Sequence, residues 1–200
     1  MKTLITGGQG DLAKFITTEL TARGYMIDAP SRSELDVTSI DSVNNFFINK
    51  KYDLVINAAG TLYSSIVADS NPSLWIRDIE VNLIGTYLTS RAAVKSNKKV
   101  HLVNISSTAA FNSYKDWTSY CAAKAGVVTL SKGLYKDNYN VTVMCPGAVD
   151  TKLRNGLSIN NPNVMTLAEG AKPILDAINT KNSYGKLFFY RKNESYEEEL

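Results

Sequence analysis

A tyrosine and a lysine stand four residues apart in the segment Ser119-Tyr120-Cys121-Ala122-Ala123-Lys124, shortly after the pair Ser106-Ser107. On a helix, side chains four residues apart lie one above the other, so Tyr120 and Lys124 are expected to share a face. A phenol is a poor acid at neutral pH, and an adjacent ammonium favours its ionised form. The spacing therefore indicates proton-transfer chemistry. The alternative is a core tyrosine beside an extended lysine.

The first element that could position this chemistry is a strand, a glycine turn and a helix at the N-terminus. Thr3-Leu4-Ile5-Thr6 is typical of a short buried strand, and apolar residues recur at helical spacing after Gly10. Gly7 and Gly10 let the backbone turn sharply and approach a diphosphate, which free amides at a helix start stabilise. Ala13 takes a third small position. An ordinary tight turn between strand and helix is the alternative.

The second strand, 25–30, leads into a segment at 31–37 that is too short to contain a crossover helix. A helix is then predicted from Ser39, which has the sequence of a helix cap. In a dinucleotide fold the adenosine ribose lies near the end of the second strand, where an arginine favours a 2′-phosphate. Arg32 therefore favours NADP, unless it is a surface arginine without that role.

Several later strands end in small or polar residues. Buried strands are predicted at 53–57, 100–105, 141–145 and 187–190, and the first three end in Ala58-Ala59-Gly60, Ser106-Ser107 and Pro146-Gly147. The carboxyl ends of parallel strands meet at one edge of a sheet, where ligands bind. We therefore expect an α/β, three-layer, doubly wound Rossmann fold, with about seven mainly parallel strands and an abbreviated segment between strands 2 and 3.

Two long helices, 72–95 and 117–135, follow the middle strands, and a shorter one is predicted over 166–179. They carry more apolar surface than one sheet face needs. Asn82 interrupts the apolar run of the first and, taken alone, is more often a structural amide than a catalytic one. The conformations of the loops 108–116 and 152–165 do not follow from the sequence. We expect a single domain over 1–200 that ends in a solvated acidic tail, 192–200.

The composition narrows the function classes. The 200 residues include 22 basic and 19 acidic side chains, and the net charge of +3 is scattered, so a nucleic-acid partner is not expected. Cys121, Cys145 and His101 form no cluster with metal-ligand spacing, so no metal is expected. No stretch reaches the roughly 18 apolar residues of a membrane span, and no signal peptide is evident. A cytoplasmic location is the expectation.

In order, the motifs Thr6-Gly7 with Gly10, Asn57-Ala58-Ala59-Gly60, Asn82, Ser107, Tyr120-Cys121-Ala122-Ala123-Lys124 and Pro146-Gly147 resemble those of the short-chain dehydrogenase/reductase family. The resemblance covers nearly the whole chain. The spacing of the glycine motif, and Ser-Glu-Leu-Asp-Val-Thr at 33–38, are more like the sugar-nucleotide reductases such as dTDP-4-dehydrorhamnose reductase. Only about fifty residues follow Pro146, however, whereas those reductases carry a substantial C-terminal substrate region.

The resemblance implies a role for each matching residue. Tyr120 would be the general acid or base, Lys124 would lower its pKa and hold the nicotinamide ribose, and Ser107 would anchor the substrate carbonyl. Asn82 would support a water relay to the lysine. The cofactor contacts implied are Gly7, Gly8, Gln9, Gly10, Asp11, Leu12, Ser31, Arg32, Asp36, Val37, Asn57, Ala58, Ala59, Gly60, Tyr120, Lys124, Pro146, Gly147, Val149 and Thr151.

The function expected from the resemblance is an oxidoreductase that moves a hydride between NADP(H), with NAD(H) possible, and a small carbonyl or alcohol substrate. Family members commonly pair through the helices that correspond to 72–95 and 117–135, so a homodimer or homotetramer is expected. Two other functions remain open. One is a non-catalytic NADP(H) sensor or scaffold on the same fold. The other is a sugar-nucleotide reductase or epimerase, which the short C-terminal region disfavours.

Overall fold

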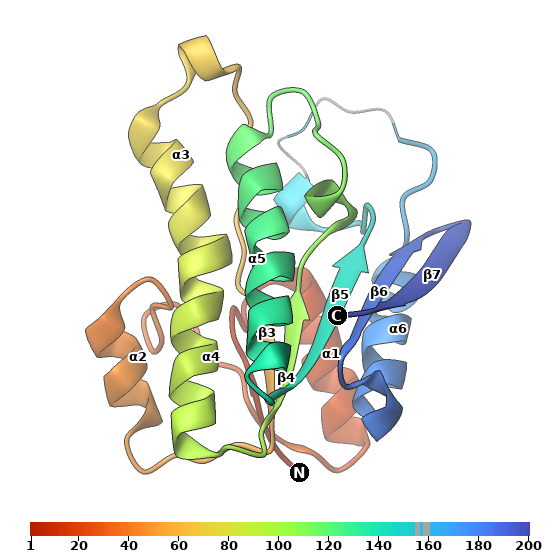
Figure 1. The fold of residues 1–200 in the computed structure, drawn as a ribbon. Coiled ribbons are helices and arrows are strands. Elements are labelled where there is room, and N and C mark those ends of the chain that lie inside the picture. The colour runs from red at the N-terminus through yellow and green to blue at the C-terminus, as the bar shows by residue number, and fades with distance from the viewer. Residues whose placement is uncertain (155–156, 158–160) are drawn as a thin grey trace.

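In the computed structural model, seven strands form one sheet in the order β2-β1-β3-β4-β5-β6-β7 (Figure 1). The first six pair in parallel and the last is antiparallel. The strands are β1 Lys2–Ile5, β2 Met26–Asp28, β3 Leu54–Asn57, β4 His101–Ile105, β5 Asn140–Pro146, β6 Lys186–Arg191 and β7 Glu194–Glu199. The order of the chain reverses between β1 and β3, where doubly wound sheets bind ligands. The predicted fold class is confirmed.

Helices cover both faces of the sheet (Figure 1). The helices α1 (Asp11–Ala22) and α6 (Leu167–Ile178) pack together on one face, over residues such as Ile5, Ile56 and Met144. The opposite face carries α2 (Ile40–Phe47), α3 (Pro72–Ile79), α4 (Gly85–Ser96) and α5 (Thr118–Lys136). Successive side chains along each strand point to opposite faces of the sheet, so each strand contributes apolar residues to the packing with the helices on both faces. The connection from β2 to β3 contains no helix before α2, as the short segment 31–37 predicted.

Several helices begin with side-chain caps, and the cap predicted at Ser39 is confirmed. Ser39 accepts a hydrogen bond from the amide of Ser42, and Asn71 caps α3 with Pro72 in its first turn. Thr166 and Glu169 form a reciprocal capping box at the start of α6. These local bonds satisfy amides that the helices leave free, so the helix boundaries follow from short-range sequence.

The predicted helix over 72–95 is divided. A π-helical turn at Glu80–Ile84 joins α3 to α4, and it contains Asn82. Such turns widen a helix by one residue and occur frequently at functional sites. Gly126 on α5 faces this turn, where an added Cβ would lie 2.8 Å from Leu83. The absence of a side chain at Gly126 therefore lets α5 approach the π turn closely.

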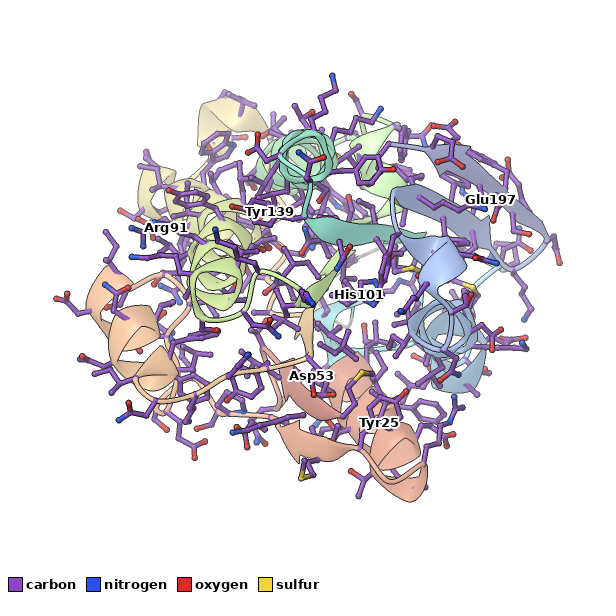
Figure 2. All side chains as sticks on the ribbon, turned by 60° about the horizontal axis from the view of Figure 1, so that its bottom comes forward. Tyr25, Asp53, Arg91, His101, Tyr139 and Glu197 are labelled. Atoms are coloured by element: carbon purple, nitrogen blue, oxygen red, sulfur yellow. The ribbon has the colours of Figure 1, made fainter. Side chains whose placement is uncertain are left out.

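The C-terminal segment corrects the predicted acidic tail at 192–200. Residues Glu194–Glu199 are exposed, as expected, but they form β7, which pairs antiparallel with β6. Figure 2 places Glu197 on this outer strand, where its carboxylate lies 2.7 Å from Lys186 Nζ. Tyr196 stacks on Phe189 with ring centroids 4.6 Å apart. Main-chain pairing and aromatic stacking together hold a segment whose charge alone indicated a free tail.

The structure describes residues 1–154, 157 and 161–200. The polar loop predicted over 152–165 therefore lies partly outside the described residues. Within the described part, no helix has the length and apolar character needed to cross a bilayer. The same residues contain no group of three side chains that could hold a metal ion. His101, at the start of β4 (Figure 2), hydrogen-bonds Thr142 at 2.8 Å, and burial lowers its pKa to about 4.

Candidate active site

A cavity of about 460 Å³ opens at the carboxyl edge of the sheet. Its wall joins the glycine turn after β1 to the ends of β3, β4 and β5 and to the start of α5. The predicted site residues that line it are Gln9, Gly10, Asp11, Leu12, Ala58, Gly60, Asn82, Ser107, Tyr120, Lys124, Pro146, Gly147, Val149 and Thr151. Segments more than 140 residues apart in sequence thus meet at one place, because the parallel strands all end there.

Tyr120 and Lys124 lie one turn apart on α5, and both are buried. The Lys124 ammonium nitrogen is 5.5 Å from the centroid of the Tyr120 ring and donates a 3.0 Å hydrogen bond to the Ile105 carbonyl. The hydroxyl of Ser106 in turn donates to the Lys124 carbonyl at 2.8 Å. These two hydrogen bonds connect α5 to the end of β4. They therefore fix the position of Tyr120 and Lys124 relative to the strand end.

Ser107 follows directly after Ser106, and its side chain is held at the cavity wall. Its hydroxyl oxygen accepts a hydrogen bond from the Ala109 amide at 3.1 Å and lies 3.4 Å from the Pro146 carbonyl, to which it donates. The Ser107 side chain also opposes the effect of burial on the pKa of Tyr120. The serine is therefore near the phenol that the sequence paired with it.

The expected lowering of the Tyr120 pKa by Lys124 is wrong for this structure. Burial is the largest effect on the pKa of Tyr120 and raises it to about 12. Burial also lowers the pKa of Lys124 to about 8, against an opposing effect of Asp78. Desolvation penalises whichever form carries charge, and it outweighs the pairing here. At neutral pH the site holds a neutral phenol and an ammonium.

Asn82 occupies the π turn, fully buried. Its amide nitrogen donates to the Thr61 carbonyl at 2.8 Å, to the Asp78 carbonyl at 2.9 Å and to Asp78 Oδ1 at 3.0 Å. Its amide oxygen has no hydrogen-bond partner among the residues that the structure describes. A Cβ added to Gly60 would lie 3.0 Å from that oxygen and 3.9 Å from Lys124 Nζ. The amide oxygen therefore faces the region of the lysine, with Gly60 leaving the space between them open.

The three glycines of the turn after β1 have different structural roles. Gly7 has a φ of +69°, and an added Cβ would lie 2.7 Å from the Cα of Ala59. A Cβ on Gly8 would lie 2.2 Å from the carbonyl oxygen of Ala29. Gly10 begins α1 without a side-chain cap and lines the cavity. The first two glycines thus allow close packing of strand ends, while the third leaves helix amides free toward the cavity.

The family of the chain follows from a comparison with known sequences. The profile described as "short chain dehydrogenase" matches residues 21–161. The chain belongs to the short-chain dehydrogenase family. An uncharacterized oxidoreductase of Staphylococcus aureus (strain MRSA252) is 39% identical over 108 residues, 50% of this chain and 47% of that protein. One from strain N315 is 34% identical over 133 residues, 63% of this chain and 58% of that protein. The chain thus spans about half the length of these relatives.

Two solved structures share the fold. An alcohol dehydrogenase from the archaeon Thermococcus sibiricus, complexed with 5-hydroxy-NADP, has a TM-score of 0.85 at 20% identity over 96% of each chain. A small-chain dehydrogenase in complex with NADPH has a TM-score of 0.86 at 16% identity, over 96% of this chain and 97% of that one. The resemblance to the short-chain dehydrogenases is therefore confirmed for the family and the fold. The narrower resemblance to sugar-nucleotide reductases stays a prediction.

Some residues predicted to contact the cofactor do not line the cavity of this short-chain dehydrogenase. Asn57 is buried, and its side chain bonds Thr89, Ser90 and Asn104 inside the core. Gly7, Gly8 and Ala59 form the packed turn beneath the cavity wall. These residues allow the ends of the strands to pack closely through backbone contacts. The spacing of the motif alone does not reveal those contacts.

The segment after β2 also lies outside the cavity lining. Arg32 is exposed, and its Nε is 3.5 Å from a carboxylate oxygen of Asp36. Ser31 bonds Glu34, and Val37 is buried against Gly85. The Asp36 carboxylate accepts bonds from the amide and hydroxyl of Thr38. The predicted adenosine contacts therefore sit on an ordered turn, with Arg32 paired to an acidic neighbour.

The sequence analysis missed one residue that acts on both Tyr120 and Lys124. Asp78, on α3, is only 1% exposed, and its electrostatic effect reaches both Tyr120 and Lys124. It stands four residues before Asn82, on the same side of the helix. An acidic residue at that spacing from the amide was the available signal. Its role depends on the burial of its carboxylate, which the sequence did not indicate because charged residues also stand beside it at Arg77 and Glu80.

Proposed function

We propose that this chain is an NADP(H)-dependent oxidoreductase that reduces a carbonyl, or oxidises an alcohol, on a small substrate. The single observation that carries the proposal is the meeting of Ser107, Tyr120 and Lys124 in one cavity that continues to the glycine turn of α1. A phenol, a hydroxyl and an ammonium at the carboxyl edge of a doubly wound sheet suit a carbonyl oxygen that must be held and protonated.

The cavity fits a dinucleotide at its glycine end. Gly10 leaves the first amides of α1 without a side-chain cap, and Gly10, Asp11 and Leu12 line the wall. Such amides bind a diphosphate through free N–H groups and the helix dipole. Lys124 would hold the nicotinamide ribose, and Pro146 to Thr151 would meet the carboxamide end. The bound cofactors of the two structural neighbours favour NADP(H).

The chain's own residues supply the proton and hold the substrate. NADPH, when bound, supplies the hydride that reduces the carbonyl carbon. The Ser107 hydroxyl donates a hydrogen bond to the substrate oxygen, and Tyr120 donates its proton to the same oxygen as the alcohol forms. Lys124, as an ammonium, then stabilises the phenolate that remains. Asn82 offers its unpaired amide oxygen to a water that would relay a proton toward Lys124.

The apolar part of the cavity lining indicates the substrate class. Aromatic and aliphatic side chains contribute to this lining, among them Leu62, Tyr114, Trp117 and Leu153. An apolar wall beside a few convergent polar groups is typical of a small-molecule site. A compact substrate with an aldehyde, ketone or quinone group is the class that this wall favours.

The direct experiment follows NADPH oxidation against a panel of aldehydes, ketones and quinones. We expect turnover on at least one class. Cofactor binding without turnover on any of them would favour the sensor or scaffold function instead. A thermal-shift screen with nucleoside diphosphates examines the sugar-nucleotide alternative, which predicts a rise in melting temperature.

Arg32 gives a prediction about cofactor choice. We expect wild type to bind NADPH more tightly than NADH, and Arg32→Ala to lose about tenfold of that preference, because a charge-assisted bond to a 2′-phosphate is removed. Nicotinamide fluorescence in a titration of each cofactor measures this. Arg23→Ala, which breaks another exposed ion pair on α1, is the control. Equal affinity of wild type for both cofactors would contradict the role of Arg32.

We further propose that the chain pairs with itself through the helices at 72–95 and 117–135. Large apolar side chains on the first of these are exposed, namely Leu74, Ile76, Ile84 and Tyr87. Exposed apolar groups gathered along a helix are typical of an interface. A homodimer or homotetramer is expected, and light scattering at micromolar concentration that gave a 22.0 kDa particle would contradict it.

A further inference from the structure

The carboxylate of Asp78 is enclosed by donors from three separate segments. Its Oδ1 accepts from the Thr61 hydroxyl at 2.7 Å and from the Asn82 amide at 3.0 Å, and its Oδ2 accepts from the Ser119 hydroxyl at 2.8 Å. An ionised carboxylate only accepts hydrogen bonds, and each of these partners donates one. The surroundings therefore match the charged form of Asp78. They also join α3 to the segment after β3 and to the first turn of α5.

This carboxylate determines which way the Asn82 amide faces. The nitrogen of that amide lies among three acceptors, which are the Asp78 carboxylate, the Asp78 carbonyl and the Thr61 carbonyl. A flipped amide would place its oxygen against these acceptors, with no donor for it. The oxygen is consequently directed toward the open space beside Gly60 and Lys124. Ser119, which bonds the other carboxylate oxygen, immediately precedes Tyr120 on α5.

The same carboxylate balances the charge of the lysine. Among the described residues, Asp78 and Lys124 are the buried side chains with a formal charge at neutral pH, since the pKa of His101 is about 4. The titratable groups that act electrostatically on Lys124 are Asp78 from α3 and Cys145 from β5, and the Tyr120 ring lies 5.5 Å from its ammonium on the same helix. Burial raises the pKa of Cys145 and of Tyr120 to about 12, so neither carries charge near neutral pH. Asp78 is therefore the acidic group that favours the charged form of Lys124, and the Asn82 amide that bonds it lies with Lys124 beside Gly60.

We propose that Asp78 is a positioning residue that keeps Lys124 charged, sets the direction of the Asn82 amide and anchors the start of the helix that carries Tyr120. The charge role follows from burial, because an isolated buried ammonium loses its proton more readily than a compensated one. The positioning role follows from the three bonds above. The catalytic meaning of both rests on the proposed function, since it assumes that Lys124 acts as an ammonium beside the cofactor.

The test reads the titration of Lys124 directly. Protein with ¹³Cε-labelled lysine is titrated by NMR, and the Lys124 signal is assigned by its loss in Lys124→Met. We expect Asp78→Asn to move the titration midpoint of Lys124 downward by about one pH unit, the lower end for loss of a nearby opposite charge. Asparagine preserves the shape, because its oxygen can accept from Thr61 and Asn82 while its nitrogen donates to Ser119.

Two further variants separate charge from other effects. Glu80→Gln removes one negative charge from an exposed position two residues further along the helix, and its midpoint is expected to match wild type. Ser119→Ala keeps the Asp78 carboxylate but removes one hydrogen bond to it. The titration midpoint of Lys124 should therefore match that of wild type in this variant as well. An Asp78→Asn midpoint equal to wild type, or an equal shift in Glu80→Gln, would overturn the proposal.

Kinetics supply the second readout. A lysine with a lowered pKa is charged below that pKa and loses its charge as pH rises, so turnover should fall on the alkaline side. In Asp78→Asn this alkaline limit should move to lower pH by the same amount as the NMR midpoint. A uniform loss of turnover with an unmoved limit would indicate a merely structural role and contradict the proposal.

Asp78→Ser, whose shorter side chain leaves room for a water, replaces Asp78→Asn if the latter fails to fold. If neither variant folds, the carboxylate is a folding requirement and the proposal is abandoned. The NMR titration needs no substrate. If the protein oxidised no NADPH, the proposed function would be overturned. The effect of Asp78 on the charge of Lys124 would still be decided by the titration.

Discussion

Tyr120→Phe is expected to lose about a thousandfold of turnover while binding NADPH with nearly unchanged affinity, because general acid catalysis typically contributes within the range of 10²–10⁴. Phenylalanine keeps the ring, which is buried with 8% of its surface exposed, and packs against Trp117 with centroids 6.1 Å apart. The hydroxyl that donates the proton is the only group removed. The fold and the cofactor end of the cavity should therefore be retained.

The measurement compares kcat on the best substrate of the panel with the NADPH dissociation constant from nicotinamide fluorescence. Tyr135→Phe is the matched control, since Tyr135 lies on the same helix and is 38% exposed, outside the residues that line the cavity. Its turnover should equal that of wild type. Turnover preserved in Tyr120→Phe would remove Tyr120 from the chemistry and with it the proposed mechanism.

Lys124→Met is expected to lower turnover at least about a hundredfold and, unlike Tyr120→Phe, to weaken NADPH binding as well. The ammonium that would hold the ribose and stabilise the phenolate is lost. The buried carboxylate of Asp78 is also left without its opposite charge. A buried carboxylate is disfavoured when a compensating positive charge is removed, so the melting temperature should fall too.

The control for this variant is Lys132→Met, an exposed lysine on the same helix. A pH profile of wild type provides an independent check. The pKa of Lys124 is lowered to about 8 by burial, so the ammonium is present below that pH and is lost above it. Activity should therefore decline as pH rises through about 8. If NADPH affinity were the same in Lys124→Met as in wild type, Lys124 would not be a cofactor contact.

Much of the fold could be read from short segments of the chain. The buried strands, the caps at Ser39, Asn71 and Thr166, and the missing helix between β2 and α2 all depend on neighbours within a few residues. The parallel order then required that the small and polar strand ends share one edge. For this reason the sequence alone predicts that Ser107, Tyr120 and Lys124 lie close together.

The predictions that were wrong involve contacts or burial beyond the local segment. Glu194–Glu199 is exposed, as its charge predicted, but it pairs with β6 as a strand, which the charge did not indicate. The pKa of Tyr120 was expected to be lowered by the lysine one turn away, whereas burial raises it. Charge and spacing are visible in a sequence. The extent to which a group is removed from water depends on how the whole chain packs.

For this protein the residue types and their spacing were sufficient for the family, the sheet and the meeting of Ser107, Tyr120 and Lys124 at one edge, since a helix turn and a strand end are short-range structures. The balance of charges at those groups came from packing. Asp78 meets Ser119 across 41 residues, and the Asn82 oxygen faces Lys124 across the space that Gly60 leaves free. Such distances have no periodicity in the sequence. They arise when α3 and α5 pack side by side and bury a carboxylate between them.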